Sequence, residues 1–219
     1  MKRLCLVDFD DTLILTDSLK SVLLGERWFL SPMMLAAGIR LFLCKLVRKG
    51  EFEARSEFKR RLLLKYSGLS DEARKAYIQL FKGKINQALT DRIRDGQFDR
   101  VVILSASEEE LIKSVIGDSI AGYDVIANKI PVNIDDGKAE TVKKTGLSDP
   151  EDQHSEGFRT CYGAEKVRRL SEVMPDYLDQ SITVYTDSFS DKPLIDIAKE
   201  AFLVKGTSII PVKGETALY

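Results

Sequence analysis

The feature that most constrains this chain is an acidic segment that directly follows a short apolar one. Residues 4–7 are apolar and predict a buried strand, and the sequence Asp-Phe-Asp-Asp-Thr follows at residues 8–12. Carboxylates this close repel one another and lose hydration when buried, so a nearby cation is expected. On extended backbone, Asp8 and Asp10 point the same way. The segment predicts a metal-assisted catalytic site or, alternatively, a solvated acidic turn with a helix cap.

Composition narrows the chemistry that is open to the chain. Its 219 residues include a single histidine, His154, and three cysteines that form no C-x-x-C pair. A histidine-based triad, a multi-histidine metal site, a zinc site and a disulfide framework are therefore not expected. Acid–base work falls to carboxylates. A cytoplasmic location is expected, because the first residues run into a strand without a secretory signal.

Charge is distributed unevenly along the sequence. Residues 15–94 contain 17 Lys and Arg against 8 Asp and Glu, whereas the remainder contains 16 basic and 26 acidic residues. This asymmetry predicts two parts with different roles, although two solvated surfaces would also account for most of the charges. The basic residues lie on expected helices without a nucleic-acid-binding motif, so nucleic acid is not an expected partner.

The order of expected elements predicts an α/β fold with an insert. Residues 15–94 read as helices throughout, and strands alternate with helices elsewhere, which predicts a doubly wound, Rossmann-like parallel sheet. We expect a core domain at 1–14 and 95–219 and an all-helical cap domain at 15–94. The expected helices cover 32–47, 51–66, 70 to about 89, 163–174 and 191–200; the expected strands cover 101–104, 125–127, 182–185 and 201–204, with a hairpin at 129–145 and a loop at 146–157.

The segment 32–47 is apolar on nearly every side of its expected helix. Pro32, Gly38, Arg40 and Lys45 interrupt it, so an integral membrane span is not expected. We expect this helix to be buried within the cap. The alternative is a surface that meets a lipid or prenyl phosphate at a membrane, aided by the basic charge of the cap.

Polar side chains also follow other expected strands. Ser105 follows one of them, and Asp187 and Asp191 follow another, at the sheet edge where doubly wound folds bind ligands. Lys166 lies in the first turn of a helix, where the helix dipole disfavours a cation, which favours a functional role. The structural alternatives are helix caps at Ser107 and at Asp191.

Together these residues resemble the four motifs of the haloacid dehalogenase superfamily, in its phosphoserine phosphatase-like branch. Residues 8–12 resemble the first motif, D-x-D-x-T, and Ser105, Lys166 and residues 187–191 resemble the second, third and fourth. The insert between the first two motifs is similar to a C1 cap. The resemblance implies a phosphatase acting on a small organic phosphomonoester, because dehalogenase members lack the second aspartate.

The resemblance also implies roles for individual residues. Asp8 would attack phosphorus to form an aspartyl-phosphate, and Asp10 would act as general acid and then general base. Ser105 and Lys166 would stabilise the phosphoryl oxygens. Mg²⁺ would be held by Asp8, the Asp10 carbonyl, Asp187 and Asp191. The implied phosphate-binding set is Phe9, Ser105, Ala106 and Lys166.

The match departs from the family pattern at several positions. Asp11 stands where glycine is commoner, and no chemistry is expected of it. Residues 105–107 are Ser-Ala-Ser, whereas phosphoserine phosphatases have Ser-Gly-Gly at the similar position, which leaves room for the substrate. The side chains at 106 and 107 therefore argue against phosphoserine itself as the substrate. Thr186 replaces the usual glycine before the fourth motif. In the cap, Asp17 and Arg60 loosely resemble substrate-binding positions, with solvated helical charges as the alternative.

Three other functions stay open at this point. The same residues fit a phosphatase acting on a lipid or prenyl phosphate, with a peripheral membrane contact. They also fit phosphoryl transfer to an alcohol acceptor. A catalytically silent phosphate-binding module is the alternative from another class, although the presence of every motif residue argues against it. The oligomeric state is not indicated by the sequence.

Overall fold

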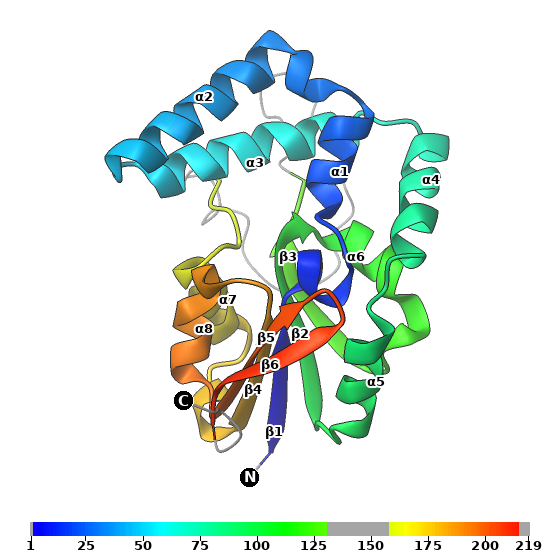
Figure 1. Cartoon of the computed structure of the whole chain (residues 1–219), viewed down its shortest axis with the longest axis vertical. Helices are drawn as coiled ribbons and strands as arrows, with labels where there is room; N and C mark the ends of the chain where they lie inside the picture. Colours follow the sequence, from blue (N-terminus) through cyan, green and yellow to red (C-terminus); the bar gives the residue numbers. More distant parts are fainter. Residues whose placement is uncertain (1, 131–157, 215–219) are drawn as a thin grey trace.

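The computed structural model describes residues 2–130 and 158–214 and consists of a helical part above an α/β part (Figure 1). Within these ranges one six-stranded sheet has the order β3-β2-β1-β4-β5-β6. All neighbours are parallel except β6, which runs antiparallel to β5. The strands are β1 (Arg3–Val7), β2 (Arg100–Glu108), β3 (Tyr123–Asn128), β4 (Ser181–Thr186), β5 (Glu200–Lys205) and β6 (Ser208–Lys213).

Helices cover both faces of the sheet and form the insert. The helices α5 and α6 lie on one side of the sheet and α7 and α8 on the other, which confirms the doubly wound α/β class (Figure 1). The predicted loop at 146–157, most of the predicted hairpin and His154 lie outside the described residues. The helices are α1 (Ser18–Gly25), α2 (Pro32–Val47), α3 (Glu51–Ser67), α4 (Asp71–Lys82), α5 (Gln87–Asp95), α6 (Glu109–Ile116), α7 (Ala164–Val173) and α8 (Lys192–Ile197).

The centre of the sheet is buried on both faces, because β1 is apolar and buried from Leu4 to Val7. In β1, Cys5 and Val7 belong to the cluster that packs under α5 and α6, whereas Leu4 and Leu6 belong to the cluster under α7 and α8. Successive strand residues point to opposite faces, so a continuous apolar run fills both layers. This packing fixes the position of the loop that follows β1.

The helix predicted from residue 70 to about residue 89 is two helices, α4 and α5. The helical conformation is interrupted between Lys82 and Gln87, where Ile85 forms a β-bridge with Ile14. Leu89 and Ile93 of α5 then pack in the cluster under the sheet. The helix α5 thus packs with the sheet, although most of its residues lie within the range expected for the cap. The boundaries between cap and core at residues 14 and 94 remain a proposal.

The prediction that the apolar helix at 32–47 is buried is wrong. The helix α2 has the predicted bounds and begins at the Ser31 cap, but Met34 and Ala37 are its buried residues. The reason is that α2 lies at the outer edge of the insert and packs along one side only, on α3 and the short turn η2 (Trp28–Leu30) (Figure 1). In the ranges that the structure describes, no helix has the length and apolar character needed to cross a membrane.

Candidate active site

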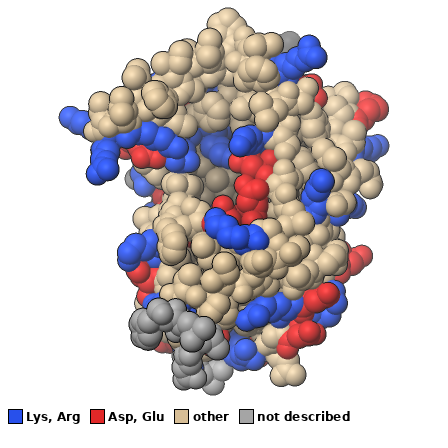
Figure 2. Space-filling view, in the orientation of Figure 1, with Lys and Arg blue, Asp and Glu red and all other residues tan. Residues whose placement is uncertain are grey.

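The predicted motif residues gather at the carboxyl edge of the sheet. Val7 of β1 pairs with Ile103 of β2 and with Tyr185 of β4, so Asp8 lies level with the residues that follow Ile103 and Tyr185, although β2 continues to Glu108. Asp8 follows β1 directly, and its backbone N–H donates to the Tyr185 carbonyl at 3.0 Å. Acidic side chains lie at the centre of the hollow between the helical and α/β parts, with Lys and Arg side chains beside them (Figure 2).

Lys166 joins the first and fourth motifs through two ion pairs. Its Nζ lies 2.9 Å from Asp8 Oδ1 and 2.6 Å from Asp191 Oδ2, and the residue is 2% exposed. Burial opposes the charge on Lys166, but the two carboxylates more than offset this and raise its pKa. The cation at the start of α7 is therefore stabilised by these carboxylates, despite the unfavourable helix dipole.

Asp8 is strongly perturbed by its surroundings. Burial raises the pKa of Asp8 to about 8, and the negative charges of Asp191 and Asp10 act in the same direction, whereas Lys166 opposes the shift. The Phe9 backbone N–H also donates to Asp8 Oδ1 at 2.9 Å. A carboxylate held in this way, with its pKa far from the ordinary value, is typical of a functional group.

Asp10 is held by groups from the insert and from β2. The Ser18 backbone N–H donates to Asp10 Oδ1 at 2.8 Å, and the Ser107 hydroxyl donates to Asp10 Oδ2. The Ser18 hydroxyl lies 2.9 Å from the Ser107 hydroxyl and completes the chain of hydrogen bonds. Burial and the neighbouring Asp17 raise the pKa of Asp10, and Lys59 opposes them. A raised pKa favours the protonated form that a general acid needs.

Both of the cap interpretations considered from the sequence are wrong. Glu108 caps α6, because its side chain accepts from the N–H groups of Glu110 and Leu111, and this leaves Ser107 free to bond Asp10. Among the described residues, Asp191 makes no capping bond with its side chain, which pairs with Lys166 instead. Buried ionic partners compete better for these side chains than solvent-facing helix ends do.

The four other residues of the predicted phosphate-binding and metal sets lie at the same edge: Phe9 follows Asp8, Ser105 and Ala106 belong to β2, and Asp187 follows β4. Ser105 is buried, and its Oγ accepts from the Ser107 backbone N–H at 3.0 Å. Ala106 is half-buried beside it. Burial raises the pKa of Asp187, as do the charges of Asp11 and Asp191, and Lys205 opposes the shift. The structure brings these residues to one edge, and their individual roles stay predictions.

Asp11 differs from its neighbours in backbone conformation. Its φ is 54°, in the left-handed region that favours glycine and tolerates aspartate or asparagine. Asp11 is exposed, and its N–H donates to the Thr16 carbonyl at 3.1 Å. The turn explains why glycine is common at this position of the motif.

The donor chemistry of the edge fits a hard cation. Asp8, Asp10, Asp187 and Asp191 supply oxygen ligands only, and Asp191 Oδ1 is buried with no hydrogen-bond partner among the described residues. In the same ranges, no group of three or more His, Cys, Asp and Glu side chains stands close enough together to form a metal cluster, and Lys166 lies between Asp8 and Asp191. The oxygen donors therefore suit Mg²⁺, and the predicted set of metal ligands remains a prediction.

Two cap residues predicted to bind substrate have other partners. Asp17 caps α1 by accepting from the Lys20 N–H at 2.8 Å, and its charge raises the pKa of Asp10. Arg60 pairs with Glu57 on the same helix, at 2.9 Å. Its neighbour Lys59 is the cap cation that acts on Asp10. The substrate-binding roles of Asp17 and Arg60 stay predictions.

Sequence reasoning missed the roles that four residues have in this site: Ser18, Lys59, Ser107 and Thr186. The Thr186 hydroxyl donates to Asp191 Oδ2 at 3.0 Å. Two of the four carried a usable signal, because Ser107 lies two residues after Ser105 and Thr186 directly precedes the fourth motif. Ser18 bonds to Asp10 and the charge of Lys59 acts on it, both from the insert, and nothing in their local sequence indicates these effects.

The insert also contacts the segment that leads into α7. The Thr160 backbone N–H donates to the Ser56 hydroxyl of α3 at 3.1 Å, and the Arg55 guanidinium lies 4.0 Å from the centre of the Tyr162 ring. These contacts place α3 over the loop that precedes Lys166. The insert is thus attached to the third motif as well as to the first.

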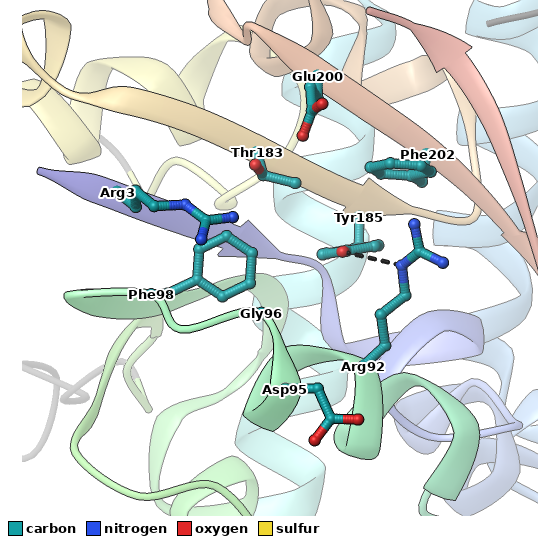
Figure 3. A pocket seen from close by; sticks show the side chains of 9 residues that line it. All are labelled: Arg3, Arg92, Asp95, Gly96, Phe98, Thr183, Tyr185, Glu200 and Phe202. Carbon is teal, nitrogen blue, oxygen red and sulfur yellow. Dashed lines mark hydrogen bonds between the residues drawn. The ribbon is translucent and has the colours of Figure 1, made fainter. Parts of the chain in front are cut away.

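A separate hollow lies on the face of the sheet near α5. Arg92 donates to the Tyr185 hydroxyl at 3.2 Å, and its guanidinium lies 4.6 Å from the centre of the Phe202 ring (Figure 3). Among the described residues that line this hollow, none belongs to the motif set. We therefore place the candidate active site at the carboxyl edge of the strands and not in this hollow.

Comparison with known proteins places this geometry in a family. A family model for haloacid dehalogenase-like hydrolases matches residues 5–196. No curated protein matches the chain.

Three solved structures share the fold. A protein of unknown function from Bordetella pertussis aligns with a TM-score of 0.56 and 15% identity, covering 92% of this chain and 89% of that one. A phosphoserine phosphohydrolase-like protein from Francisella tularensis has a TM-score of 0.52 and 17% identity, covering 92% and 86%. A HAD family hydrolase from Salmonella enterica has a TM-score of 0.54 and 13% identity, covering 90% and 60%.

Proposed function

Because the chain belongs to the haloacid dehalogenase-like hydrolase family, we propose that it is a magnesium-dependent phosphatase acting on a small organic phosphomonoester. The observation that carries the proposal is the arrangement of Asp8 and Asp10. Asp8 is ion-paired to buried Lys166, and Asp10 is hydrogen-bonded by two groups on a separate side of the site. This arrangement supports the proposal that Asp8 is the nucleophile and Asp10 the proton carrier.

In the proposed first step, Asp8 attacks phosphorus and the bond from phosphorus to the leaving oxygen breaks. Asp10 gives its proton to that oxygen, so the alcohol leaves neutral and Asp8 carries the phosphoryl group. In the second step Asp10 takes a proton from water, which attacks phosphorus and releases phosphate from Asp8. The raised pKa of Asp10 suits the first role, and Ser107 and Ser18 hold its side chain in place for both.

Lys166 and Ser105 are proposed to stabilise the phosphoryl oxygens, with backbone N–H groups at Phe9 and Ala106. Phosphoryl transfer depends mainly on such positioning and on electrostatic stabilisation. Mg²⁺ would be held by Asp8, the Asp10 carbonyl, Asp187 and Asp191, and would neutralise charge that builds up on the transferred group. Lys166 lies close enough to Asp8 to act on the same oxygens.

The substrate proposal rests on the space between α3 and the sheet edge. The charge of Lys59 opposes the raised pKa of Asp10, so a cation of the insert acts on the residue that is proposed to protonate the leaving group. The Ser107 side chain bonds to Asp10, at a position where phosphoserine phosphatases have glycine. We therefore propose a substrate other than phosphoserine, with an anionic or polar group that Lys59 contacts.

The test is hydrolysis of an aryl phosphate in the presence of Mg²⁺. Asp8→Asn should lower turnover by roughly 10⁴-fold or more, because no other group can form the covalent intermediate.

Asp11→Asn is the matched control. It removes an adjacent exposed carboxylate, asparagine accepts the left-handed backbone, and most activity should remain. Wild-type protein without turnover, or full turnover by Asp8→Asn, would sink the proposal. Tight phosphate binding without turnover would favour a silent binding module.

A further inference from the structure

The outer side of α2 is an apolar surface that nothing in the described part of the chain covers. Its residues recur at the spacing of one helical stripe, and their side chains are 52–71% exposed. We call this surface the outer α2 face. It consists of Leu35, Ile39, Phe42, Leu43, Leu46 and Val47.

This face is larger than the scattered exposed apolar residues of an ordinary surface. From residue 35 to residue 47 it runs for roughly 18 Å along the helix, at about 1.5 Å per residue. Leu30 and Phe29 extend it at the amino end and are 67% and 42% exposed. A contiguous exposed apolar patch of this kind is typical of a docking surface.

The charged residues of the segment that carries the outer α2 face are all basic. Residues 27–50 contain five Lys and Arg and no Asp or Glu. At about 100° per residue, Arg40 lies at one edge of the stripe and Lys45 at the other. Both side chains are exposed, and Arg48 and Lys49 follow at the end of the helix.

An apolar stripe with basic edges matches an anionic lipid surface. Such a helix lies in the plane of the interface, with its apolar side chains among the acyl chains and its cations among the head groups. A second copy of the chain fits less well, because a two-fold interface would place the same basic edges against one another. We propose that the outer α2 face docks the protein on anionic membranes.

The position of α2 in the fold agrees with this proposal. The helix α3 lies between α2 and the sheet, so the outer α2 face points away from the candidate active site (Figure 1). Docking there would leave the carboxyl edge of the sheet accessible. The proposal does not rest on catalysis, because it uses no residue of the proposed phosphatase machinery.

The test is co-sedimentation with lipid vesicles. Wild-type protein should bind vesicles of phosphatidylcholine with about one third phosphatidylglycerol at least tenfold more strongly than phosphatidylcholine alone. Raising NaCl from about 0.05 M to about 0.5 M should weaken binding, because salt screens the cations.

The double variant Phe42→Ser/Leu46→Ser should lower the partition coefficient by roughly tenfold or more. Arg40→Glu/Lys45→Glu should abolish the preference for the anionic vesicles.

Matched variants elsewhere on the surface control for exposure and charge. Val173→Ser/Leu178→Ser removes two residues that are 56% and 62% exposed, and Lys75→Glu/Lys199→Glu makes the same charge change away from α2. Both should bind vesicles like wild type. Every variant should keep its circular dichroism and its hydrolysis of a water-soluble aryl phosphate.

The outcomes separate this proposal from its competitors and from the proposed function. Absence of wild-type binding, or equal binding by the outer-face and control variants, would overturn it. So would a wild-type dimer that the outer-face variants dissociate without any vesicle binding, because a second copy would then be the occupant. Asp8→Asn should bind vesicles like wild type, so failure of catalysis and failure of docking are distinguishable.

Discussion

At the scale of single residues, Asp10 lies between two charges of opposite sign that both come from the insert. Asp17 raises the pKa of Asp10 and Lys59 lowers it, on top of the larger effect of burial. The pKa of Asp10 is therefore tuned both by Asp17, which is seven residues away, and by Lys59, which is far from it in sequence. If Asp10 is the general acid, these two charges set the pH above which the first step slows.

Removing each of these charges should move the pH profile in opposite directions. Lys59→Met removes a cation that favours the ionised form, so the pKa of Asp10 should rise and the descending limb of kcat/KM should move to higher pH. Asp17→Asn should move that limb to lower pH, and asparagine still caps α1. The measurement is kcat/KM for aryl phosphate hydrolysis with Mg²⁺ as a function of pH.

Arg60→Met is the control and should leave the descending limb of kcat/KM in place, because Arg60 pairs with Glu57. Shifts of both variants in the same direction would contradict this assignment.

At the scale of elements, Asn86 joins three separate segments near the site. It is fully buried, and its side-chain N–H groups donate to the carbonyls of Thr12 and Gly206, at 3.1 and 2.9 Å. Its Oδ1 accepts from the Leu89 N–H and caps α5. One side chain thus ties the first motif to a helix of the sheet layer and to the turn between β5 and β6.

Asn86→Ala should therefore cost more stability than the loss of an ordinary helix cap. It removes one cap, leaves the buried Thr12 carbonyl without its donor and loses the bond to the exposed Gly206, so the free energy of unfolding should fall by about 3 kcal/mol. Ser70→Ala is the matched control, because it removes only the cap of α4, and it should cost about 1 kcal/mol. Urea denaturation of both variants gives the comparison. Equal losses would show that the two carbonyl contacts contribute nothing.

At the scale of the whole molecule, the sheet edge concentrates carboxyl groups that bind protons more tightly when folded. Burial and like charges raise the pKa values of Asp8, Asp10 and Asp187, that of Asp8 from 3.8 to about 8. Above the unfolded pKa, ionisation therefore costs the folded state more than the unfolded chain. The metal-free protein should lose stability as pH rises from about 4 to about 8.

Mg²⁺ should offset this loss, most strongly at the higher pH. A ligand that binds the folded state raises stability by RT ln(1 + [L]/Kd), and protons compete with the metal for the same oxygens. The increase in Tm produced by Mg²⁺ over a chelator should thus be larger at pH 8 than at pH 5. Asp187→Asn should reduce the increase, whereas Asp11→Asn should retain it. A metal effect that is independent of pH, or that is equal in the two variants, would contradict the proposed ligand set.

Much of the fold was predictable because the signals were local. Apolar runs marked the central strands, the Ser-Pro pair marked the start of α2, and the order of strands and helices indicated the doubly wound sheet, which the structure confirms. The strand β6 was missed, since its residues are only half-buried and its sequence includes a proline, Pro211. The break between α4 and α5 was missed because the bridge of Ile85 to Ile14 is a contact between distant segments.

The sequence by itself determined which polar residues follow the apolar runs of the central strands, and the parallel topology then brought Asp8, Ser105 and Asp187 to one edge. Only the tertiary structure decided the partners: Lys166 between Asp8 and Asp191, Ser107 and Ser18 on Asp10, and an open outer face on α2. The physical reason is that strand and helix patterns act over a few residues, whereas ion pairs, pKa shifts and exposure depend on distances between elements that are far apart in the chain.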